Sequence, residues 1–418
     1  MIKKKNLKLA IVGLGYVGLP LALEFSKKRT LIGFDTNKKR INELNLGIDK
    51  NLETTKSKLQ QSKNITFTHK QKDLNFSNCY IITVPTPIDK FKKPNLKPLF
   101  AATKIVAKYI KRNDIIIYES TVYPGCIEED CVPIIEKFSS LKFNKDFFCG
   151  YSPERINPGD KYHTISNIKK ITSGSNPFIS NLVDDLYKEI INAGTHKAPS
   201  IKVAEAAKII ENTQRDLNIA LVNELSILFK KMNIDINAVL DAAESKWNFI
   251  SFKPGLVGGH CIGVDPYYLT YKAKNVGYNP KVILAGRETN DKMGIYAAKE
   301  LIKEMKKKGI PISGANILIM GLTFKENCAD IRNSGVEKVV FELKKYNCKI
   351  DLYDPWADSQ EIMKKYKIIL KKKLSKKKYD SVFVAVAHDK FKLLGINKIK
   401  EICKKNHLIY DLKNLFRK

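Results

Sequence analysis

The segment of residues 256–269, LVGGHCIGVDPYYL, combines residue types that can do covalent chemistry. Cys261 follows two glycines and a histidine, and Asp265 lies four residues further along the chain. A thiol in a glycine-rich loop is accessible, and a thiolate there can add to a carbonyl carbon as a nucleophile. A lone cysteine is more commonly a small buried residue of a core, but a core thiol does not need three neighbouring glycines.

Other candidate residues come from two earlier segments. Lys208 and Asn212 lie one helical turn apart in AAKIIENTQR and so point to the same side of a predicted helix. That face is otherwise rich in alanine and isoleucine, so the lysine must extend to solvent, pair with an acid or act chemically. Glu154 lies between prolines in the loop GYSPERINPGD, where a glutamate is usually a solvated surface group and a catalytic role is the alternative.

A glycine pattern near the start indicates a dinucleotide site. Gly13, Gly15 and Gly18 form GLGYVG between a predicted strand and a predicted helix, which permits a tight turn and a close approach of pyrophosphate to the backbone. Asp35 ends the next predicted strand, where a carboxylate can accept hydrogen bonds from both ribose hydroxyls of NAD and repel the 2′-phosphate of NADP. The basic residues at 38–40 weaken this preference.

Two more loops follow predicted strands of the same sheet. VPTP (84–87) and STVYPG (120–125) lie at strand ends, on the side expected for the nicotinamide, although each alone reads as an ordinary turn. A cysteine together with a cofactor that accepts hydride suggests covalent oxidation of an aldehyde. The thiolate adds to the carbonyl, the hemithioacetal loses hydride, and water cleaves the remaining thioester.

These residues require elements that position them. Short apolar runs alternate with helix-length segments up to about residue 195, which predicts a parallel sheet covered by helices on both faces. From about residue 199, some thirty residues with helical periodicity and no proline or glycine predict one long helix. A second strand-and-helix series begins near residue 311. We therefore predict an α/β protein with two Rossmann-like, doubly wound domains (1–195 and 310–418) joined by a central helical domain (196–300).

The composition limits the class of protein. With 418 residues and 44% hydrophobic content the chain is globular, and eight cysteines without regular spacing are expected to be reduced thiols of a cytoplasmic protein. The basic, apolar start resembles a signal peptide, but glycines interrupt it and no cleavage site follows. The sequence contains no uninterrupted run of eighteen apolar residues, so we predict no membrane insertion.

The net charge of +31 is compatible with an anionic partner. Lysines are spread along the whole chain, however, which favours a solvated surface over specific nucleic-acid binding.

Seven sequence blocks together resemble a known family. In order they are GLGYVGLP, VPTP, ESTVYPG, YSPERINPGD, AAKIIENTQRDLNIALVNELS, PGLVGGHCIGVDPYYL and GLTFKENCADIRNSG. They are similar to the nucleotide-sugar 6-dehydrogenases, the group that contains UDP-glucose and GDP-mannose dehydrogenases, from about residue 8 to the C-terminus. Within it the blocks resemble the branch that oxidises UDP-N-acetylhexosamines, as in the synthesis of Vi-type capsule and O-antigen. The family implies a homodimer or a larger homo-oligomer.

The resemblance implies catalytic roles. Cys261 would carry the thioester, and Lys208 would stabilise the alkoxide or oxyanion at C6, with Asn212 donating a second hydrogen bond. Asp265 would position or deprotonate a water that Thr121 helps to hold.

Further roles also follow only from the resemblance. Glu154 would assist thioester hydrolysis, Lys325 would contact the substrate, and Arg332 would act near the cofactor or the domain interface. Residues expected to contact NAD are Gly13, Gly15, Tyr16, Val17, Gly18, Asp35, Arg40, Pro85, Thr86, Thr121 and Arg332. Residues expected to contact the UDP-sugar are Glu154, Arg155, Lys208, Asn212, Gly258, Gly259, His260 and Lys325. No metal is expected, because no His, Cys or acidic cluster has ligand spacing.

The predicted substrate depends on positions where this sequence differs from UDP-glucose dehydrogenase. His260 stands where UDP-glucose dehydrogenase usually has serine, and the IGVDPYY tail also differs. Both differences tell against UDP-glucose and favour an N-acetylated sugar. The resemblance to the enzymes of Vi-type capsule and O-antigen synthesis implies UDP-GlcNAc or UDP-GalNAc, with UDP-ManNAc and UDP-glucose as alternatives. His260 either shapes the loop or lowers the pKa of the thiol. A non-catalytic sugar-nucleotide-binding protein would lack the nucleophile or the lysine, and both are present.

Overall fold

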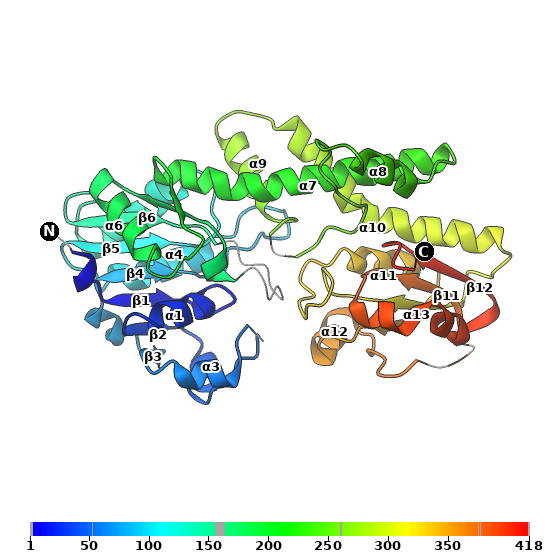
Figure 1. The fold of residues 1–418 in the computed structure, drawn as a ribbon, viewed down its shortest axis with the longest axis horizontal. Coiled ribbons are helices and arrows are strands. Elements are labelled where there is room, and N and C mark those ends of the chain that lie inside the picture. Colours follow the sequence, from blue (N-terminus) through cyan, green and yellow to red (C-terminus); the bar gives the residue numbers. More distant parts are fainter. Residues whose placement is uncertain are drawn as a thin grey trace. The chain divides into compact units, whose positions relative to one another are not determined.

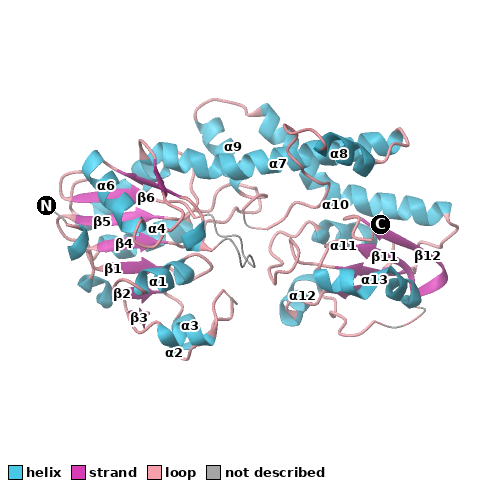
Figure 2. Cartoon of the chain, viewed as in Figure 1, coloured by secondary structure: helices cyan, strands magenta, loops and turns pink. Residues whose placement is uncertain are grey.

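The protein packs as two compact units (Figures 1 and 2). A computed structural model describes residues 3–51, 53–154, 164–259, 261–374, 376 and 378–416. The first unit comprises Met1–Glu211 and Tyr267–Gly277, and the second comprises Asn212–Pro266 and Tyr278–Lys418. The division into domains at 1–195, 196–300 and 310–418 stays a prediction.

The first unit contains an eight-stranded sheet in the order β3-β2-β1-β4-β5-β6-β7-β8. Neighbouring strands from β3 to β6 are parallel, and this order is that of dinucleotide-binding sheets. The strands are β1 (Leu9–Val12), β2 (Leu31–Phe34), β3 (Ile65–Thr68), β4 (Cys79–Ile82), β5 (Asp114–Tyr118), β6 (Phe147–Tyr151), β7 (Lys170–Gly174) and β8 (Thr195–Lys197).

One strand pairing differs from the predicted parallel sheet. Strand β7 pairs with β6 in the antiparallel direction, through Gly150 opposite Gly174 and Tyr151 opposite Ser173. A parallel neighbour requires a crossover that usually contains an α-helix. Among the described residues between β6 and β7 the only helical segment is the 3₁₀ turn Ile165–Asn167, so the chain returns antiparallel.

Helices cover the central strands of this sheet. Strands β1, β4 and β5 are buried along their whole length, as expected for a sheet with helices on both faces. On one face α1 and α6 meet, where the rings of Phe25 and Tyr187 lie 5.8 Å apart. The helices are α1 (Gly18–Ser26), α2 (Lys38–Asn45), α3 (Lys56–Gln61), α4 (Lys97–Ala107), α5 (Val132–Ser139) and α6 (Pro177–Tyr187).

The predicted long helix is confirmed as α7 (Ile201–Lys231). It contains neither proline nor glycine, and Lys230 and Lys231 in its last turn complement the negative end of the helix dipole. It is followed by α8 (Ile236–Glu244), α9 (Asp265–Asn275) and α10 (Lys281–Lys307). No helix among the described residues is long and apolar enough to cross a membrane.

The second unit contains the second predicted sheet, with the order β10-β9-β11-β12 and all neighbours parallel. Along β9, Ile317 and Ile319 belong to the core shared with α10 and α11, whereas Leu318 and Met320 belong to the core shared with α13. Its elements are β9 (Asn316–Met320), α11 (Val336–Lys345), β10 (Lys349–Tyr353), α12 (Ser359–Tyr366), β11 (Tyr379–Val384), α13 (Asp389–Ile402) and β12 (Cys403–Asp411).

Candidate active site

The glycine loop lies between β1 and α1, as predicted. Gly13 has a φ of +99°, and its N–H donates to the Phe34 carbonyl at 2.8 Å. A Cβ atom on Gly18 would lie 1.8 Å from the Gly13 carbonyl oxygen, so only glycine lets α1 approach the strand. A Cβ atom on Gly15 would meet nothing within 4 Å, so the backbone there is open to a ligand. Tyr16 and Val17 lie in the same loop, and its form fits a dinucleotide pyrophosphate.

Asp35 and Arg40 flank this loop in different ways. Asp35 follows β2, and its carboxylate accepts the N–H groups of Leu14 (2.9 Å) and Asn37 (2.8 Å). Arg40 is buried, donating from Nε to the Leu14 carbonyl at 3.0 Å and from NH1 to Asp49 at 2.7 Å. The Arg40 charge is therefore offset by Asp49. Arg40 supports the glycine loop in this structure, and its direct contact with NAD stays a prediction.

The nucleotide preference is testable at Asp35. We expect the unaltered chain to use NAD in preference to NADP, and Asp35→Asn to reduce the preference by about 10- to 100-fold, which is roughly 1.4–2.8 kcal/mol. The substitution removes the charge that repels a 2′-phosphate and keeps the side-chain shape. The ratio of kcat/KM for the two cofactors measures it, with Lys108→Ala, at an exposed position outside the nucleotide loop, as control. Equal use of NADP by the unaltered chain would contradict this role of Asp35.

Hydrogen bonds connect the loop after β4 to the glycine loop and to the loop after β5. Thr83 Oγ1 donates to the Gly13 carbonyl at 2.6 Å, and Ser120 Oγ donates to the Val84 carbonyl at 2.6 Å. The Tyr268 hydroxyl, from the DPYYL segment, donates to the Thr86 carbonyl at 2.8 Å. The structure thus brings together three loops of the first unit, and with them the predicted residues Pro85, Thr86 and Thr121.

Glu205 fixes the end of the loop after β5, and no sequence motif indicated this role. Its buried carboxylate accepts the N–H groups of Gly125 (2.5 Å) and Ile127 (3.0 Å). Burial raises the pKa of Glu205 to about 8, although these two hydrogen bonds act to lower it. Because Glu205 lies in α7 one turn before Lys208, the loop that contains Thr121 is anchored close to Lys208 along the same helix.

Glu154 is not the solvated loop residue that its sequence context usually indicates. It is 9% exposed, and its Oε2 accepts from Lys170 Nζ at 3.1 Å. Lys170, the first residue of β7, also donates to Glu119 at 2.9 Å and to the Pro153 carbonyl at 3.2 Å. The structure therefore places Glu154 in a buried ionic cluster that the sequence analysis missed.

Lys208 and Asn212 are both buried on α7, at 5% and 1% exposure, so the lysine does not extend to solvent. Asn212 Nδ2 donates to Asp265 Oδ2 at 2.5 Å. Asp265 is the first residue of α9, and its backbone N–H donates to the Cys261 carbonyl at 2.8 Å. Within the second unit, Asn212, Asp265 and the backbone of Cys261 therefore form one connected group.

The accessibility of Cys261 sets it apart from the other thiols. None of the eight cysteines, all of which the structure describes, forms a disulfide, and Cys261 is partly exposed whereas the other seven are buried. Burial raises the pKa of Cys79 to about 12 and of Cys348 and Cys403 to about 11, which keeps those thiols protonated and unreactive. Accessibility thus favours Cys261 as the nucleophile.

The glycines before Cys261 allow close packing against the segment 321–335. A Cβ atom on Gly259, whose φ is +81°, would lie 2.7 Å from the Phe324 ring, and one on Gly258 would lie 2.8 Å from the Asn333 carbonyl oxygen. The Gly259 N–H donates to the Arg332 carbonyl (3.2 Å), and Asn333 Nδ2 donates to the Gly259 carbonyl (3.1 Å). These contacts require glycine at both positions and fix the start of the cysteine loop.

The two predicted basic residues of this segment lie on the same loop. The Arg332 guanidinium pairs with Asp330 at 2.6 Å, and Lys325 Nζ lies 5.7 Å from the centre of the Phe324 ring. The Thr323 hydroxyl donates to the Lys325 carbonyl at 2.9 Å and lies 3.3 Å from the ring of buried His388. The predicted contacts of Lys325 with substrate and of Arg332 with cofactor stay predictions.

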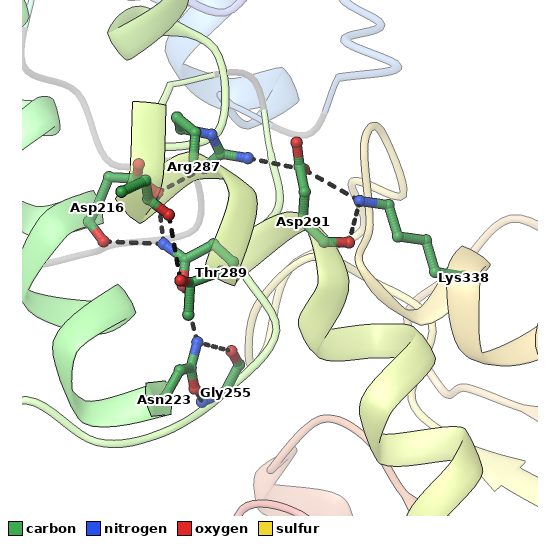
Figure 3. Close-up of polar contacts among 9 residues, drawn as sticks. Asp216, Asn223, Gly255, Arg287, Thr289, Asp291 and Lys338 are labelled. Carbon is green, nitrogen blue, oxygen red and sulfur yellow. Dashed lines mark hydrogen bonds and ion pairs between the residues drawn. The ribbon is translucent and has the colours of Figure 1, made fainter. Parts of the chain in front are cut away.

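A buried polar network holds the backbone that leads into the cysteine loop (Figure 3). Asn223 of α7 accepts the Gly255 N–H at 2.8 Å and donates to the Gly255 carbonyl at 3.0 Å. Asn223 also donates to Asn290 of α10 at 2.8 Å, and Asn290 donates to Asp216 at 2.8 Å. Asp216 pairs with Arg287 at 2.5 Å. The backbone at Gly255, six residues before Cys261, is therefore held by α7 and α10.

Two predicted substrate residues, Arg155 and His260, lie outside the described residues. Among the described residues there is no group of three or more His, Cys, Asp or Glu side chains that could hold a metal ion.

Comparison with known proteins identifies the family of this chain. Residues 7–191, 202–292 and 318–418 match the NAD binding, central and UDP binding domains of the UDP-glucose/GDP-mannose dehydrogenase family. The chain is 59% identical to UDP-N-acetyl-D-glucosamine 6-dehydrogenase of Pseudomonas aeruginosa (98% of this chain, 97% of the relative) and 58% identical to that of Salmonella typhi (98% and 96%). A solved UDP-D-ManNAc dehydrogenase from Pyrococcus horikoshii superposes with a TM-score of 0.89 at 29% identity (98% and 96%). The chain belongs to the UDP-glucose/GDP-mannose dehydrogenase family and is an NAD-dependent nucleotide-sugar dehydrogenase.

Proposed function

We propose that this enzyme oxidises C6 of UDP-N-acetylglucosamine, or of its C4 epimer UDP-N-acetylgalactosamine, from hydroxymethyl to carboxylate. The two relatives at 59% and 58% identity, which the chain matches over nearly its whole length, carry the name UDP-N-acetyl-D-glucosamine 6-dehydrogenase. The observation that carries the reaction type is the one partly exposed thiol, Cys261, in a chain that contains the family's NAD-binding domain. The product would serve capsule or O-antigen polysaccharide synthesis.

The first oxidation converts the alcohol to an aldehyde. When bound, NAD⁺ would supply the acceptor for one hydride from C6 in each of the two oxidations, so the complete reaction would use two NAD⁺. In the first oxidation the proton of the C6 hydroxyl would leave to water. We assign Lys208 to stabilise the negative charge that develops on the C6 oxygen, since a buried ammonium does so effectively in a site that excludes water. Asn212 has one amide N–H engaged by Asp265 and would donate its second to the same oxygen.

The second oxidation requires the thiol. The Cys261 sulfur forms a bond to the aldehyde carbon, and the carbonyl electrons move to oxygen to give a thiohemiacetal. Loss of hydride from that carbon leaves a thioester on Cys261. A water molecule that Asp265 deprotonates and Thr121 helps to hold then attacks the carbonyl. The C–S bond breaks, the thiolate is restored, and the uronic acid leaves as its carboxylate.

Stoichiometry and substrate choice test this proposal together. We expect two NADH per sugar nucleotide, with the highest kcat/KM for UDP-GlcNAc or UDP-GalNAc among UDP-GlcNAc, UDP-GalNAc, UDP-ManNAc, UDP-glucose and GDP-mannose. The measurement is NADH absorbance at complete conversion of a known amount of each substrate. One NADH per sugar with an accumulating aldehyde would contradict the four-electron reaction. A preference for UDP-ManNAc or UDP-glucose would contradict the substrate assignment alone.

We further propose that the enzyme acts in the cytoplasm, where its eight free thiols remain reduced, and as at least a homodimer. The support for an oligomer is the surface of α7. Val203 and Ile210, and again Leu221 and Leu228, are exposed apolar residues seven positions apart on this helix. Such spacing forms an apolar stripe of the kind that pairs helices of two subunits.

A further inference from the structure

A buried histidine, His388, connects three loops at the carboxyl ends of the second sheet. Asp354 directly follows β10, Thr323 lies in the loop after β9, and His388 lies in the loop after β11. These three strands are parallel neighbours in the sheet, and ligands of such sheets bind at the carboxyl ends of the strands. All three residues are buried, and the catalytic proposal gives none of them a role.

The contacts of His388 determine which ring nitrogen carries its proton. The backbone N–H of Asn327 donates to Nδ1 at 3.0 Å, so Nδ1 is the acceptor. The proton therefore lies on Nε2, which is 3.2 Å from Asp354 Oδ2 and 3.3 Å from Thr323 Oγ1. Both oxygens can accept it, because the Thr323 hydroxyl gives its own hydrogen to the Lys325 carbonyl at 2.9 Å. The ring thus joins the loop after β9 to the end of β10.

Asp354 fixes the backbone at the start of the same loop. Its Oδ2 accepts the N–H groups of Leu322 at 2.7 Å and Thr323 at 3.2 Å. Its Oδ1 accepts those of Trp356 at 2.8 Å and Ala357 at 3.1 Å. All of these groups are donors, so the side chain acts as a buried carboxylate. A buried polar network that is satisfied in this way holds its surroundings in one arrangement.

Lys325 lies inside the segment that these contacts hold. Thr323 and Asn327, two residues before and two residues after it, both contact the His388 ring. Asn327 also exchanges two hydrogen bonds with Asp389, the first residue of α13. Its Nδ2 donates to Asp389 Oδ2 at 2.7 Å, and its Oδ1 accepts the Asp389 N–H at 3.1 Å. The backbone position of Lys325 is therefore set by buried contacts on both sides.

We propose that His388, Asp354 and Thr323 are positioning residues for substrate binding, which hold the loop so that the Lys325 ammonium meets the diphosphate of the nucleotide sugar. The inference rests on the proposed function and on the predicted contact of Lys325 with the UDP-sugar. The loop belongs to the region, residues 318–418, that matches the family's UDP binding domain. A lysine ammonium is a point charge on a flexible stem, so its contact with a phosphate depends on where the backbone places it.

Thr323→Val removes the hydroxyl that joins His388 to the Lys325 carbonyl and keeps the branched shape of the side chain. We expect the Kd for UDP and the KM for UDP-GlcNAc to rise about 5- to 10-fold, as for one weakened hydrogen bond to a charged group. The kcat and the KM for NAD should not change, because uniform binding of the substrate affects its KM alone. His388→Phe, which keeps a ring against Phe391, should act in the same direction. If it fails to fold, Thr323→Val still tests the inference.

The matched control is Ser381→Ala. Ser381 is as buried as Thr323, and its Oγ donates to the Leu408 carbonyl at 2.9 Å, the length of the bond from Thr323 to the Lys325 carbonyl. It lies within β11 rather than at the strand ends. Urea denaturation should therefore show similar destabilisation of the two variants. Titration calorimetry with UDP should show a weaker Kd for Thr323→Val alone.

Lys325→Met tests whether the effect acts through the ammonium. Alone it should raise the Kd for UDP by about 10- to 100-fold. Adding Thr323→Val to it should raise the Kd by no more than about twofold further, because residues that act through one contact are not additive.

Several outcomes would overturn the inference. One is full additivity of Thr323→Val and Lys325→Met, and another is a KM for NAD that rises as much as the KM for UDP-GlcNAc. A Kd for UDP that Lys325→Met leaves unchanged would also overturn it, while two NADH per sugar would still support the proposed function. One NADH per sugar would contradict the four-electron reaction, and the UDP titrations would still decide the role of the loop.

Discussion

Cys261→Ser is expected to lower kcat for the complete oxidation by about 10⁴-fold or more, the order of effect seen when a covalent nucleophile is removed. Serine keeps the size of the side chain, but its hydroxyl is not ionised at neutral pH and does not form the thiohemiacetal efficiently. In the proposed mechanism the thiol acts only after the first oxidation, so the first NADH should still form. Rapid-mixing absorbance should therefore show at most one NADH per sugar, followed by a stalled reaction.

The matched control is Cys348→Ser, at a buried thiol of the second unit whose Sγ contacts the Ile312 carbonyl at 3.5 Å. This variant should retain two NADH per sugar. A Cys261→Ser variant that completes the oxidation at the normal rate would show that Cys261 is not the nucleophile and has only a structural role.

Asp216→Ala is expected to destabilise the second unit by about 3–5 kcal/mol, because it leaves the buried Arg287 charge without its closest partner. Asp216 is fully buried and accepts from both Arg287 and Asn290, so both donors lose an acceptor. Urea denaturation followed by tryptophan fluorescence measures this change, since the two tryptophans of the chain, Trp247 and Trp356, both lie in the second unit. Through Asn290 and Asn223, the change should also loosen Gly255 and lower the activity.

The control for this variant is Asp291→Ala on α10, one turn after Arg287. Asp291 accepts from Arg287 at 2.9 Å and from Lys338 at 3.0 Å, but its side chain is 21% exposed (Figure 3). Its loss should cost about 1 kcal/mol or less. Equal destabilisation by the two variants would show that the network does not depend on the buried Asp216 pair.

Local patterns were enough to predict much of the fold. The run that becomes β1, the glycines that follow it, and α7 could be predicted because each depends on residues close in sequence. The face shared by Lys208 and Asn212 followed from helical periodicity alone. Strands β3, β6 and β8 were not among the predicted ones. Strands β3 and β8 lie at sheet edges, with partly exposed residues and no continuous apolar run. Strand β6 lies inside the sheet and is largely buried, so edge exposure does not explain why it was missed.

The supports of the site could not be predicted, because they join distant positions. Lys170 reaches Glu119 across 51 residues, and Asn223 reaches Gly255 across 32. Nothing in the composition around Glu154 indicates that a lysine sixteen residues later will bury it. Likewise, the antiparallel return of β7 depends on how the chain folds back after β6, which strand-helix alternation does not reveal.

The difference between one partly exposed sulfur and seven buried ones also bears on how the enzyme responds to oxidants. Peroxide reacts with accessible thiolates, so oxidation would begin at Cys261 and stop turnover. The seven buried cysteines in the hydrophobic cores of the two units would be oxidised only later. A sulfenic acid at Cys261 is reversible by thiol reductants. Oxidation of the nucleotide sugar by this protein would then decline under oxidative stress and recover with the reducing capacity of the cell, without any need for new protein.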